Sequence, residues 1–405
     1  MNILFLTQGY KPAFRLGGPI VSVSALAETL VQLGHEVSVV TTNSNFDQSL
    51  DVPLGVPHDV DGVTVRYFER REILSTLFPF IPYFRRSRGF SYSPDMGRYL
   101  RGLSHKFDVV HTQLPFTYPT IAGARYARRT QTPLFYNQRG VFHPNSLNFR
   151  SVKKRQYIKW IERPILDQAA ALVALTQTEV GTFAALGTQT PAEVVPNGIA
   201  AQRYRTIPKR APAGVSAQAQ VVLFLGRLHP SKGADSLLEA FLKVAAEHPD
   251  ATLVLAGPDE FELEDKFKAQ VTSHGLTERV VFPGMVIGDD KLDWLARADL
   301  FVLPSHGEGF SMAILEALAS ATPVLITPAC NFPEVESAGC GVVSANAPAE
   351  LANRLRSLLS DPQELVRMGQ AGRELMVNEY TWERIAGKLL GVYERGIARF
   401  SQRER

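Results

Sequence analysis

Cysteine is scarce in this chain of 405 residues, which contains only Cys330 and Cys340. Two thiols form no disulfide framework, and no Cys/His spacing indicates a zinc site, so the composition fits a reducing compartment. Long hydrophobic runs are also missing, because no stretch of about 18 apolar residues is present that would span a membrane. The N-terminal "MNILFLTQGYKP" has no basic leader, and we interpret it as a first strand rather than a signal peptide.

Neither sign of charge is in large excess. The formal net charge is +3 and the pI is about 8.8, which is too mild to predict nucleic acid as a partner. No G-x-G-x-x-G follows the first strand of either half, so a nicotinamide dehydrogenase is a remote alternative. A chain of this length is too long for one hydrophobic core, and we expect two domains.

Short apolar runs alternate with longer amphipathic stretches along the whole chain. Many runs are apolar throughout, as in strands of a parallel sheet covered on both faces. The predicted strands are 3–7, 37–42, 63–68, 108–112, 133–137 and 171–176 in the first half, and 221–226, 252–257, 279–284, 300–305 and 323–327 in the second. Helical patterns such as 19–34 and 234–248 lie between them. The sequence therefore predicts an α/β protein with doubly wound parallel sheets.

A linker is predicted at "RTIPKRAPAGVSAQAQ" (205–220), which is rich in Pro, Ala and Gly and has no clear period. We therefore predict an N-terminal domain over 1–204 and a C-terminal domain over 221–380. Each half opens with a strand, a loop carrying basic and glycine residues, and a helix start. In such sheets ligands bind beyond the carboxyl ends of the strands, so these loops are the candidate binding loops.

Two helix starts are candidate anion sites, because the first N–H groups of a helix are unpaired and lie at the positive end of its dipole. One start follows Gly17 and Gly18. The other follows Gly309, Phe310 and Ser311.

Two cations and two carboxylates accompany these helix starts. "GRLHPSKG" (226–233) places Arg227 and Lys232 after a strand, and two positive charges suit a diphosphate. Glu316 lies about one turn into the second helix, where its carboxylate would accept hydrogen bonds from the hydroxyls of a ribose. Glu308, on the loop before that helix, would hold the hydroxyls of a sugar beyond the diphosphate. The set predicts a nucleoside diphosphate sugar as ligand.

"EGFSMAILE" resembles the Glu-x7-Glu signature of retaining glycosyltransferases with the GT-B fold, a large bacterial and plant family that includes sucrose synthases and many polysaccharide-building transferases. Other motifs occur in the family's order: "GGP" near the start, "VPNGI" (195–199), "GRLHPSKG", "LAGPDE" (255–260), "VFPGMV" (281–286) and "ADLFVLPSHGEGF" (298–310). Each motif alone is a weak signal, but the occurrence of all of them in the family's order is specific to the family. The resemblance implies two Rossmann-like domains facing each other across a cleft, with a C-terminal helix (381–405) that packs back on the N-terminal domain.

The resemblance also implies roles for single residues. Arg227, Lys232 and the backbone N–H of Gly18 would bind the diphosphate, next to the helix start at Gly309, Phe310 and Ser311. Glu316 would bind the ribose, Glu308 the donor sugar, and the backbone at Gly284 and Met285 would lie against the base. Asn197 and Gly198 are similar to the family's hinge-side loop.

One position departs from the family. Many members have His-Gly after the fifth strand, with the histidine near the reacting carbon, whereas this chain has Arg139-Gly140. The histidine's role does not transfer unchanged, and Arg139 would bind phosphate or acceptor instead. His111 and His143 are the nearby histidines that we consider for the chemistry.

The implied activity is retaining, metal-independent transfer of a sugar to an acceptor hydroxyl, without a further cofactor. The expected acceptor is a lipid-linked oligosaccharide in surface polysaccharide assembly, and the expected location is cytoplasmic, on the inner face of a membrane. A sugar phosphorylase, a nucleotide-sugar epimerase and a non-catalytic nucleotide-sugar-binding subunit stay open as alternatives.

Other interpretations of these motifs are purely structural. Ser305-x-x-Glu308 fits a capping box, but Gly307 and Gly309 disfavour a helix start there. "DVDG" (59–62) contains the Asp-x-Asp metal signature of the other main glycosyltransferase fold, and we interpret it instead as a turn entering a strand. No metal is predicted.

Basic and aromatic residues are interleaved in two segments, 78–94 and 150–163. Such composition suits an anionic membrane surface, a groove for an anionic acceptor, or a loop. We predict membrane association through 78–94.

Overall fold

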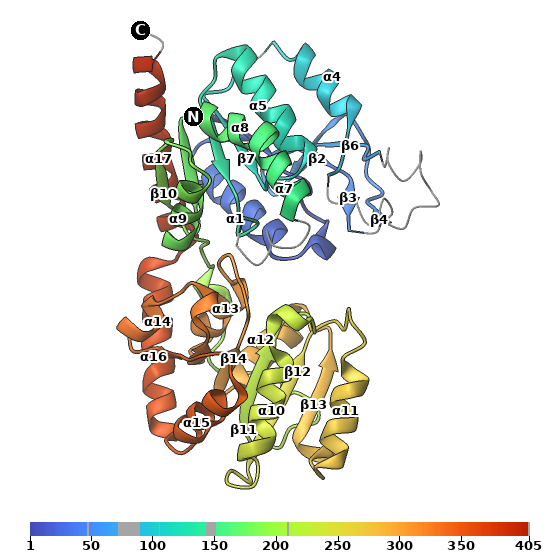
Figure 1. Ribbon diagram of the computed structural model, residues 1–405, viewed down its shortest axis with the longest axis vertical. Helices are drawn as coiled ribbons and strands as arrows, with labels where there is room; N and C mark the ends of the chain where they lie inside the picture. Colours follow the sequence, from blue (N-terminus) through green and yellow to red (C-terminus); the bar gives the residue numbers. More distant parts are fainter. Residues whose placement is uncertain (47, 72–89, 105, 143–150, 209, 404–405) are drawn as a thin grey trace. The chain divides into compact units, whose positions relative to one another are not determined.

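The computed structural model describes residues 1–46, 48–71, 90–104, 106–142, 151–208 and 210–403. The chain forms two compact units (Figure 1). The first contains Met1–Gly198 and Trp382–Arg405, and the second contains Ile199–Thr381. The division after Gly198 precedes the domain end predicted at 204, and the predicted linker 205–220 belongs to the second unit.

The first unit is built on an eight-stranded sheet in the order β10-β9-β8-β7-β1-β2-β6-β5. Its strands are β1 (Asn2–Leu6), β2 (Glu36–Thr42), β5 (Pro57–Val60), β6 (Val63–Phe68), β7 (Val109–Gln113), β8 (Leu134–Asn137), β9 (Ala171–Ala174) and β10 (Ala192–Val194). All neighbours pair in parallel except β5 and β6. A separate two-stranded ribbon joins β3 (Ser44–Asn45) and β4 (Gln48–Ser49).

The helices of the first unit follow the strands, as a doubly wound sheet requires. They are α1 (Gly18–Gln32), α4 (Pro94–Gly102), α5 (Tyr118–Thr130), α7 (Ser151–Tyr157), α8 (Arg163–Gln168), α9 (Gln177–Ala185) and α17 (Trp382–Arg403), with a π-helical stretch (Ile158–Glu162) between α7 and α8. The strands β1, β7, β8 and β9 are almost wholly buried, which explains their apolar sequences.

The last helix, α17, returns to the first unit and runs alongside β10 in Figure 1. Arg399 of α17 pairs with Glu193 of β10 at 3.2 Å. The ring of Tyr393 packs on Phe135 of β8 with centroids 4.7 Å apart. The helix therefore completes the core of the first unit, as the resemblance implied.

The second unit has a six-stranded, all-parallel sheet in the order β13-β12-β11-β14-β15-β16. Its strands are β11 (Gln220–Leu225), β12 (Ala251–Ala256), β13 (Val280–Gly284), β14 (Leu300–Leu303), β15 (Val324–Ile326) and β16 (Gly341–Val343). Its helices are α10 (Ala234–Val244), α11 (Glu264–Ser273), α12 (Gly288–Arg297), α13 (Met312–Ala319), α14 (Glu334–Ser337), α15 (Pro348–Leu359) and α16 (Pro362–Glu379). The two parallel-sheet domains confirm the predicted α/β class and the GT-B fold.

The "DVDG" segment closes the hairpin between β5 and β6. Asp61 (φ 53°) and Gly62 (φ 82°) both have left-handed backbone, as a type I′ turn requires, and Val60 pairs with Val63 across it. The turn predicted from the sequence is therefore confirmed. Within the described residues, no group of three or more His, Cys, Asp or Glu side chains is arranged to hold a metal ion.

Candidate functional site

The sheet of the second unit reverses its winding between β11 and β14. β12 lies on one side of β11 and β14 on the other, so the loops at their carboxyl ends border a topological switch point, where open α/β sheets bind ligands. These two loops touch: the N–H of His306 donates to the carbonyl of Ser231 (2.8 Å), and the Ser305 hydroxyl donates to the same carbonyl (2.9 Å). The loop carrying Lys232 and the loop carrying Glu308 thus form one edge.

Gly233 allows this close approach. Its backbone is left-handed (φ 72°), and a Cβ at this position would lie 2.1 Å from the carbonyl oxygen of Pro304. A side chain would therefore push the two loops apart, which explains why a glycine ends "GRLHPSKG".

Lys232 and Glu308 form an ion pair at this edge, with Nζ and Oε1 2.6 Å apart. Both side chains are largely buried, with 19% and 10% exposed. The Glu308 backbone is fixed on both sides, because its N–H donates to Ala329 (2.9 Å) and its carbonyl accepts from Asn331 (2.7 Å). Oε2 of Glu308 has no partner among the described residues and is available to a sugar hydroxyl.

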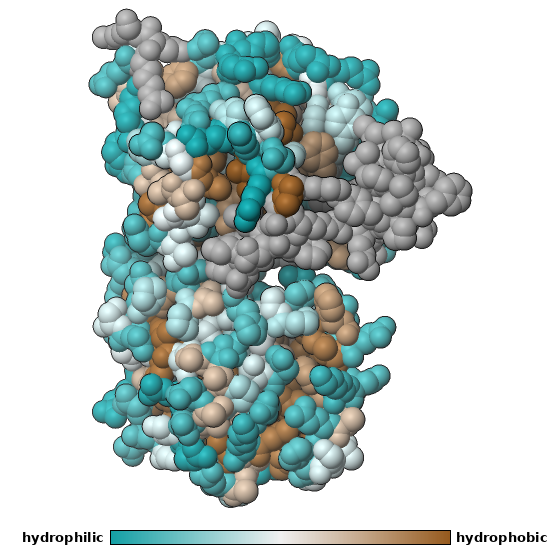
Figure 2. Space-filling model, viewed as in Figure 1, coloured by the Kyte–Doolittle hydropathy of each residue, from teal (hydrophilic) through white to brown (hydrophobic). Residues whose placement is uncertain are grey.

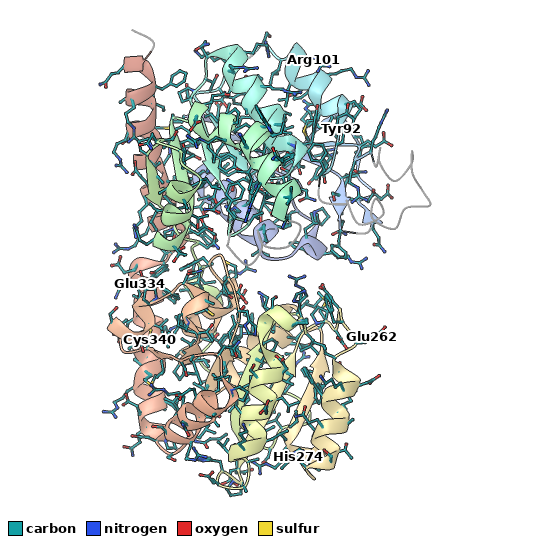
Figure 3. All side chains as sticks on the ribbon, in the orientation of Figure 1. Tyr92, Arg101, Glu262, His274, Glu334 and Cys340 are labelled. Carbon is teal, nitrogen blue, oxygen red and sulfur yellow. The ribbon has the colours of Figure 1, made fainter. Side chains whose placement is uncertain are left out.

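Arg227 lies nearer the surface. Its guanidinium is 51% exposed and pairs with Glu260 at 2.9 Å. Glu260 belongs to the loop after β12, whose residue Glu262 is labelled in Figure 3. Burial first, and then the charges of Arg227 and Lys232, lower the pKa of His229. The charges of Arg227 and Lys232 therefore both act on the ring of His229. Its Nδ1 accepts from the N–H of Ser231 (3.0 Å).

The helix start after residue 311 is where the sequence placed it. α13 begins at Met312 with Ser311 as N-cap, and no side chain caps it, which leaves its first N–H groups for a ligand. Phe310 is buried and packs edge-on against Phe332, with ring centroids 4.9 Å apart. No helix begins at 306, so the capping-box interpretation of Ser305 and Glu308 is wrong.

Glu316 lies inside α13, with only 8% of its side chain exposed. Its Oε1 accepts from Lys291 Nζ (2.8 Å) and from the Tyr204 hydroxyl (3.0 Å). Oε2 has no partner within the described parts of the chain. One oxygen is therefore fixed by the protein and the other is available to a ribose hydroxyl.

Sequence reasoning missed Lys291 and Tyr204. Lys291 follows two aspartates in the first turn of α12 and reads as part of a solvated helix face. Tyr204 comes just before the expected linker, in a segment without periodicity. Neither position carries a local signal of contact with Glu316.

Gly284 and Met285 lie at the same carboxyl edge of the second sheet. Gly284 is the last residue of β13, and its carbonyl accepts from the N–H of Gly257 (2.8 Å). The Met285 side chain is 65% exposed. An exposed thioether here leaves an apolar surface on which a base can lie.

Both cysteines lie in the second unit as buried free thiols. Cys340, labelled in Figure 3, precedes β16. Burial raises the pKa of each thiol to about 11. They are therefore packing residues rather than nucleophiles.

In the first unit, Gly18 is the first residue of α1 and Pro19 lies in its first turn. Gly17, the N-cap, has φ 85° and no side chain to cover the helix start. Pro19 has no N–H and the N–H of Ile20 donates to the carbonyl of Gly17 (3.1 Å), so among the first three residues of α1 only Gly18 has an N–H without a partner in the described part of the chain, at the carboxyl end of β1.

Arg139 follows β8 and is fixed by three neutral groups. Its Nε donates to Gln113 Oε1 (2.6 Å), and Nη1 donates to the hydroxyl of Ser22 (3.0 Å) and to Oδ1 of Asn197 (3.1 Å). Burial lowers the pKa of Arg139 to about 10, so it remains cationic. Nη2 donates to none of the described residues, which leaves one face of the guanidinium for an anionic ligand.

His111 corrects our sequence-based interpretation. Its side chain has no exposed surface, and Nδ1 is hydrogen-bonded to the Tyr393 hydroxyl of α17 (2.7 Å). Burial first, and then the charge of Arg139, lower the pKa of His111 to about 3. It is a neutral core residue that anchors α17, and we withdraw it from the catalytic set. His143 lies outside the described residues.

Comparison with known proteins agrees with this geometry. Residues 17–198 match the family model of the glycosyl transferase 4-like domain, and residues 208–375 match that of glycosyl transferases group 1. Together the two models match most of the chain, which belongs to the glycosyltransferases with the GT-B fold.

Individual relatives support the same family. The chain is 28% identical over 402 residues to a D-inositol 3-phosphate glycosyltransferase of Thermobispora bispora, covering 95% of this chain and 91% of the relative. It is 29% identical over 262 residues to the lipopolysaccharide core biosynthesis mannosyltransferase LpcC of Rhizobium leguminosarum bv. viciae, covering 62% and 71% of the two chains. Among solved structures, Anabaena HepE in complex with UDP and glucose aligns with a TM-score of 0.72 at 20% identity, covering 97% of this chain and 99% of that one.

Proposed function

We propose that this glycosyltransferase is a retaining, metal-independent hexosyltransferase that moves a sugar from a nucleoside diphosphate sugar to a hydroxyl of a lipid-linked oligosaccharide. The observation that carries the proposal is the Lys232–Glu308 pair at 2.6 Å, at the switch point beside the open N-terminus of α13. A cation for the diphosphate and a carboxylate for the sugar hydroxyls stand there side by side.

The reaction concentrates negative charge on the departing diphosphate while the sugar becomes cation-like. Lys232, Arg227 and the first N–H groups of α13 would stabilise that charge, and pre-aimed groups of this kind contribute about 10²–10³-fold each. The same cations support metal independence, because they supply the positive charge that a metal would otherwise bring.

Glu308 would hold the sugar rather than attack it. Its Oε1 already accepts from Lys232, so Oε2, which has no partner among the described residues, would accept from a hydroxyl. Retention would then follow from attack on the face that the diphosphate leaves, with a phosphate oxygen taking the proton of the acceptor hydroxyl. This step needs no carboxylate base.

A basic and aromatic surface on α7 and the following π-helix supports an acceptor at a membrane. Val152 and Trp160 are 69% and 67% exposed, and Lys159 Nζ lies 5.2 Å from the centroid of the Trp160 ring. Arg155 is also exposed. Exposed tryptophan flanked by cations suits the head-group region of an anionic bilayer.

The segment first considered for this role lies mostly outside the described residues, which resume at Phe90. Within the described ranges no helix combines the length and apolar character needed to cross a bilayer. In Figure 2 hydrophilic residues make up much of the visible face of each unit, with separate apolar patches between them. Contact with a membrane would then be peripheral, on its cytoplasmic face.

Calorimetric screening against UDP-, GDP-, ADP- and dTDP-sugars, followed by a radiolabelled transfer assay, tests the activity. We expect one donor to bind and its sugar to appear on a lipid-linked acceptor with the anomeric configuration kept. Phosphate-dependent turnover would indicate a phosphorylase, and release of free nucleotide without acceptor would indicate an epimerase. Binding without turnover of any kind would indicate a non-catalytic subunit.

Vesicle sedimentation tests the membrane contact. The wild type should bind vesicles containing anionic lipid, less so as salt rises, and Trp160→Ala should bind several-fold more weakly. Lys243→Ala, a change on the exposed face of α10, serves as the matched control. Equal binding to neutral and anionic vesicles at every salt concentration would remove the membrane surface from the proposal.

A further inference from the structure

The turn after β8 has an unusual backbone. Arg139 (φ 47°) and Gly140 (φ 78°) are both left-handed. For glycine this costs little, but for arginine it costs about 1–2 kcal/mol. The surroundings of the turn must therefore hold Arg139 in place.

Glu179, in the first turn of α9, holds this turn. Its side chain is buried, with 5% of the residue exposed. One carboxylate oxygen accepts from the N–H of Gly140, and the other accepts from the N–H of Leu175 at 2.7 Å. The carboxylate therefore ties the residue next to Arg139 to the end of β9.

The backbone carbonyl of Glu179 forms a further hydrogen bond to this turn. Its carbonyl accepts from Gln138 Nε2 (3.1 Å), and Gln138 Oε1 accepts from the N–H of Phe142 (3.2 Å). Residues on both sides of Arg139 are thus anchored to one helix start.

Charge adds a further link between the two residues. Among the described residues, the direct partners of the Arg139 guanidinium are neutral, and the Glu179 carboxylate is the negative group whose field favours its charge. His111 of β7 faces Arg139 from the sheet and stays neutral, since its pKa lies near 3. Tyr393 of α17 stays protonated, because burial raises its pKa. Glu179 is therefore the counter-charge of a partly buried cation.

We infer that Glu179 is a positioning residue for the transfer reaction: in its ionised form it fixes the Arg139 turn so that Nη2 of Arg139, which donates to none of the described residues, meets a phosphate oxygen of a substrate. The inference rests on the proposed function. Protonation would cost the carboxylate one of its two N–H donors and remove the counter-charge of Arg139. Burial, opposed by the hydrogen bonds from Leu175 and Gly140, raises the pKa of Glu179 to about 7. The hydrogen bond and the counter-charge are therefore lost as the pH falls through about 7.

The test is the pH dependence of kcat/KM for the full chain. In the wild type we expect an acid limb with an apparent pKa near 7 and a tenfold fall per pH unit below it. Glu179→Gln should be about tenfold slower at pH 8 and lack that limb, whereas Glu179→Asp, which keeps the charge, should retain one. A Glu179→Gln enzyme with the wild-type limb would overturn the inference, as would a wild-type profile that is flat between pH 5.5 and 8.

The KM values separate the two possible sources of the phosphate. An effect of Glu179→Gln on the KM of the donor assigns Nη2 to the diphosphate, and an effect on that of the acceptor assigns it to a lipid-linked phosphate. If KM for both substrates and kcat are all unchanged at pH 8, Glu179 positions nothing. If Glu179→Gln does not fold, the comparison of Glu179→Asp with the wild type decides, because loss of the limb there would contradict the role of the charge.

A measurement without turnover distinguishes failure of this inference from failure of the proposed activity. The unfolded state releases the Glu179 proton near its ordinary pKa of 4.5 and the folded state near 7, so the folded wild type loses stability as pH rises through this window. Its Tm should fall relative to that of Glu179→Gln between pH 4.5 and 7. A difference in Tm that stays constant with pH would show that Glu179 does not titrate in this range, even if the protein transfers no sugar.

Discussion

Lys232 and Glu308 meet across 2.6 Å although 76 residues separate them in sequence. The contact occupies one of the three donors of the ammonium and one of the two oxygens of the carboxylate. Each group therefore retains capacity for a ligand, the first for phosphate and the second for hydroxyls. In the proposed complex the lysine charge would also offset the repulsion between the Glu308 carboxylate and the diphosphate.

Lys232→Ala should lower turnover by at least tenfold, because the leaving diphosphate loses a cation and Glu308 loses its partner. Arg227→Ala should also lower turnover at least tenfold in the radiolabelled assay. Lys243→Ala is the control, since Lys243 pairs with Glu239 on the exposed face of α10. Wild-type turnover in Lys232→Ala would remove the diphosphate assignment.

Glu316→Gln should weaken binding of the nucleoside diphosphate and abolish its preference for ribose. A hydrogen bond to a charged group contributes about 1.5–3 kcal/mol, so calorimetry should find the wild type at least tenfold tighter for the ribonucleotide than for its 2′,3′-dideoxy analogue. The variant should bind both alike, while Glu350→Gln, at an exposed position of α15, should keep the discrimination. A wild type that does not distinguish the two sugars would show that Glu316 binds something else.

Gly233→Ala should destabilise the second unit by about 2–3 kcal/mol, because the new methyl group meets the Pro304 carbonyl and the backbone is left-handed. Gly387→Ala is the matched control: Gly387 lies in α17 with open space around its Cβ position, and alanine there should stabilise by up to about 1 kcal/mol. Thermal unfolding measures both. Equal melting temperatures for the two variants would contradict the close approach of the loops.

His111→Gln should leave turnover at pH 8 within about twofold of the wild type, whereas a general acid or base contributes about 10²–10⁴-fold. Its effect should appear in stability. His111 titrates near pH 6.5 when unfolded and near 3 when folded, so its contribution is complete above pH 6.5 and is lost as pH falls towards 3. Denaturant titrations should show that His111→Gln lacks this loss, which amounts to about 4 kcal/mol. A hundredfold fall in turnover would return His111 to the reaction.

Strands were predictable because parallel strands are buried on both faces and read as continuous apolar runs. Three of the strands that the sequence did not predict lie at the edges of the two large sheets. Pro57–Val60 is an exposed edge strand that pairs antiparallel with β6, and Ala192–Val194 and Gly341–Val343 are edge strands of three residues. Such short edges carry little hydrophobic pattern.

Candidate site residues can be chosen from the sequence where local chemistry marks them. The glycines around Lys232 and Glu308 and the polar Glu316 inside an apolar run depart from what packing alone requires. Lys291, Tyr204 and Glu179 look ordinary in sequence, since only the folded sheets bring them to Glu316 and Arg139. His111 shows the converse error, because a histidine on a central strand was taken for a functional group.

The placement of α17 has a consequence for biosynthesis. Residues Ile199–Thr381 contain a whole domain and leave the ribosome before Trp382–Arg403 does. The second domain is thus synthesised completely before the first one is. Until α17 has been made, Phe135 and His111 of the first domain lack their contacts with Tyr393. A chain truncated ahead of Tyr393 would keep that apolar surface exposed for good, which makes it a candidate for aggregation and for chaperone capture.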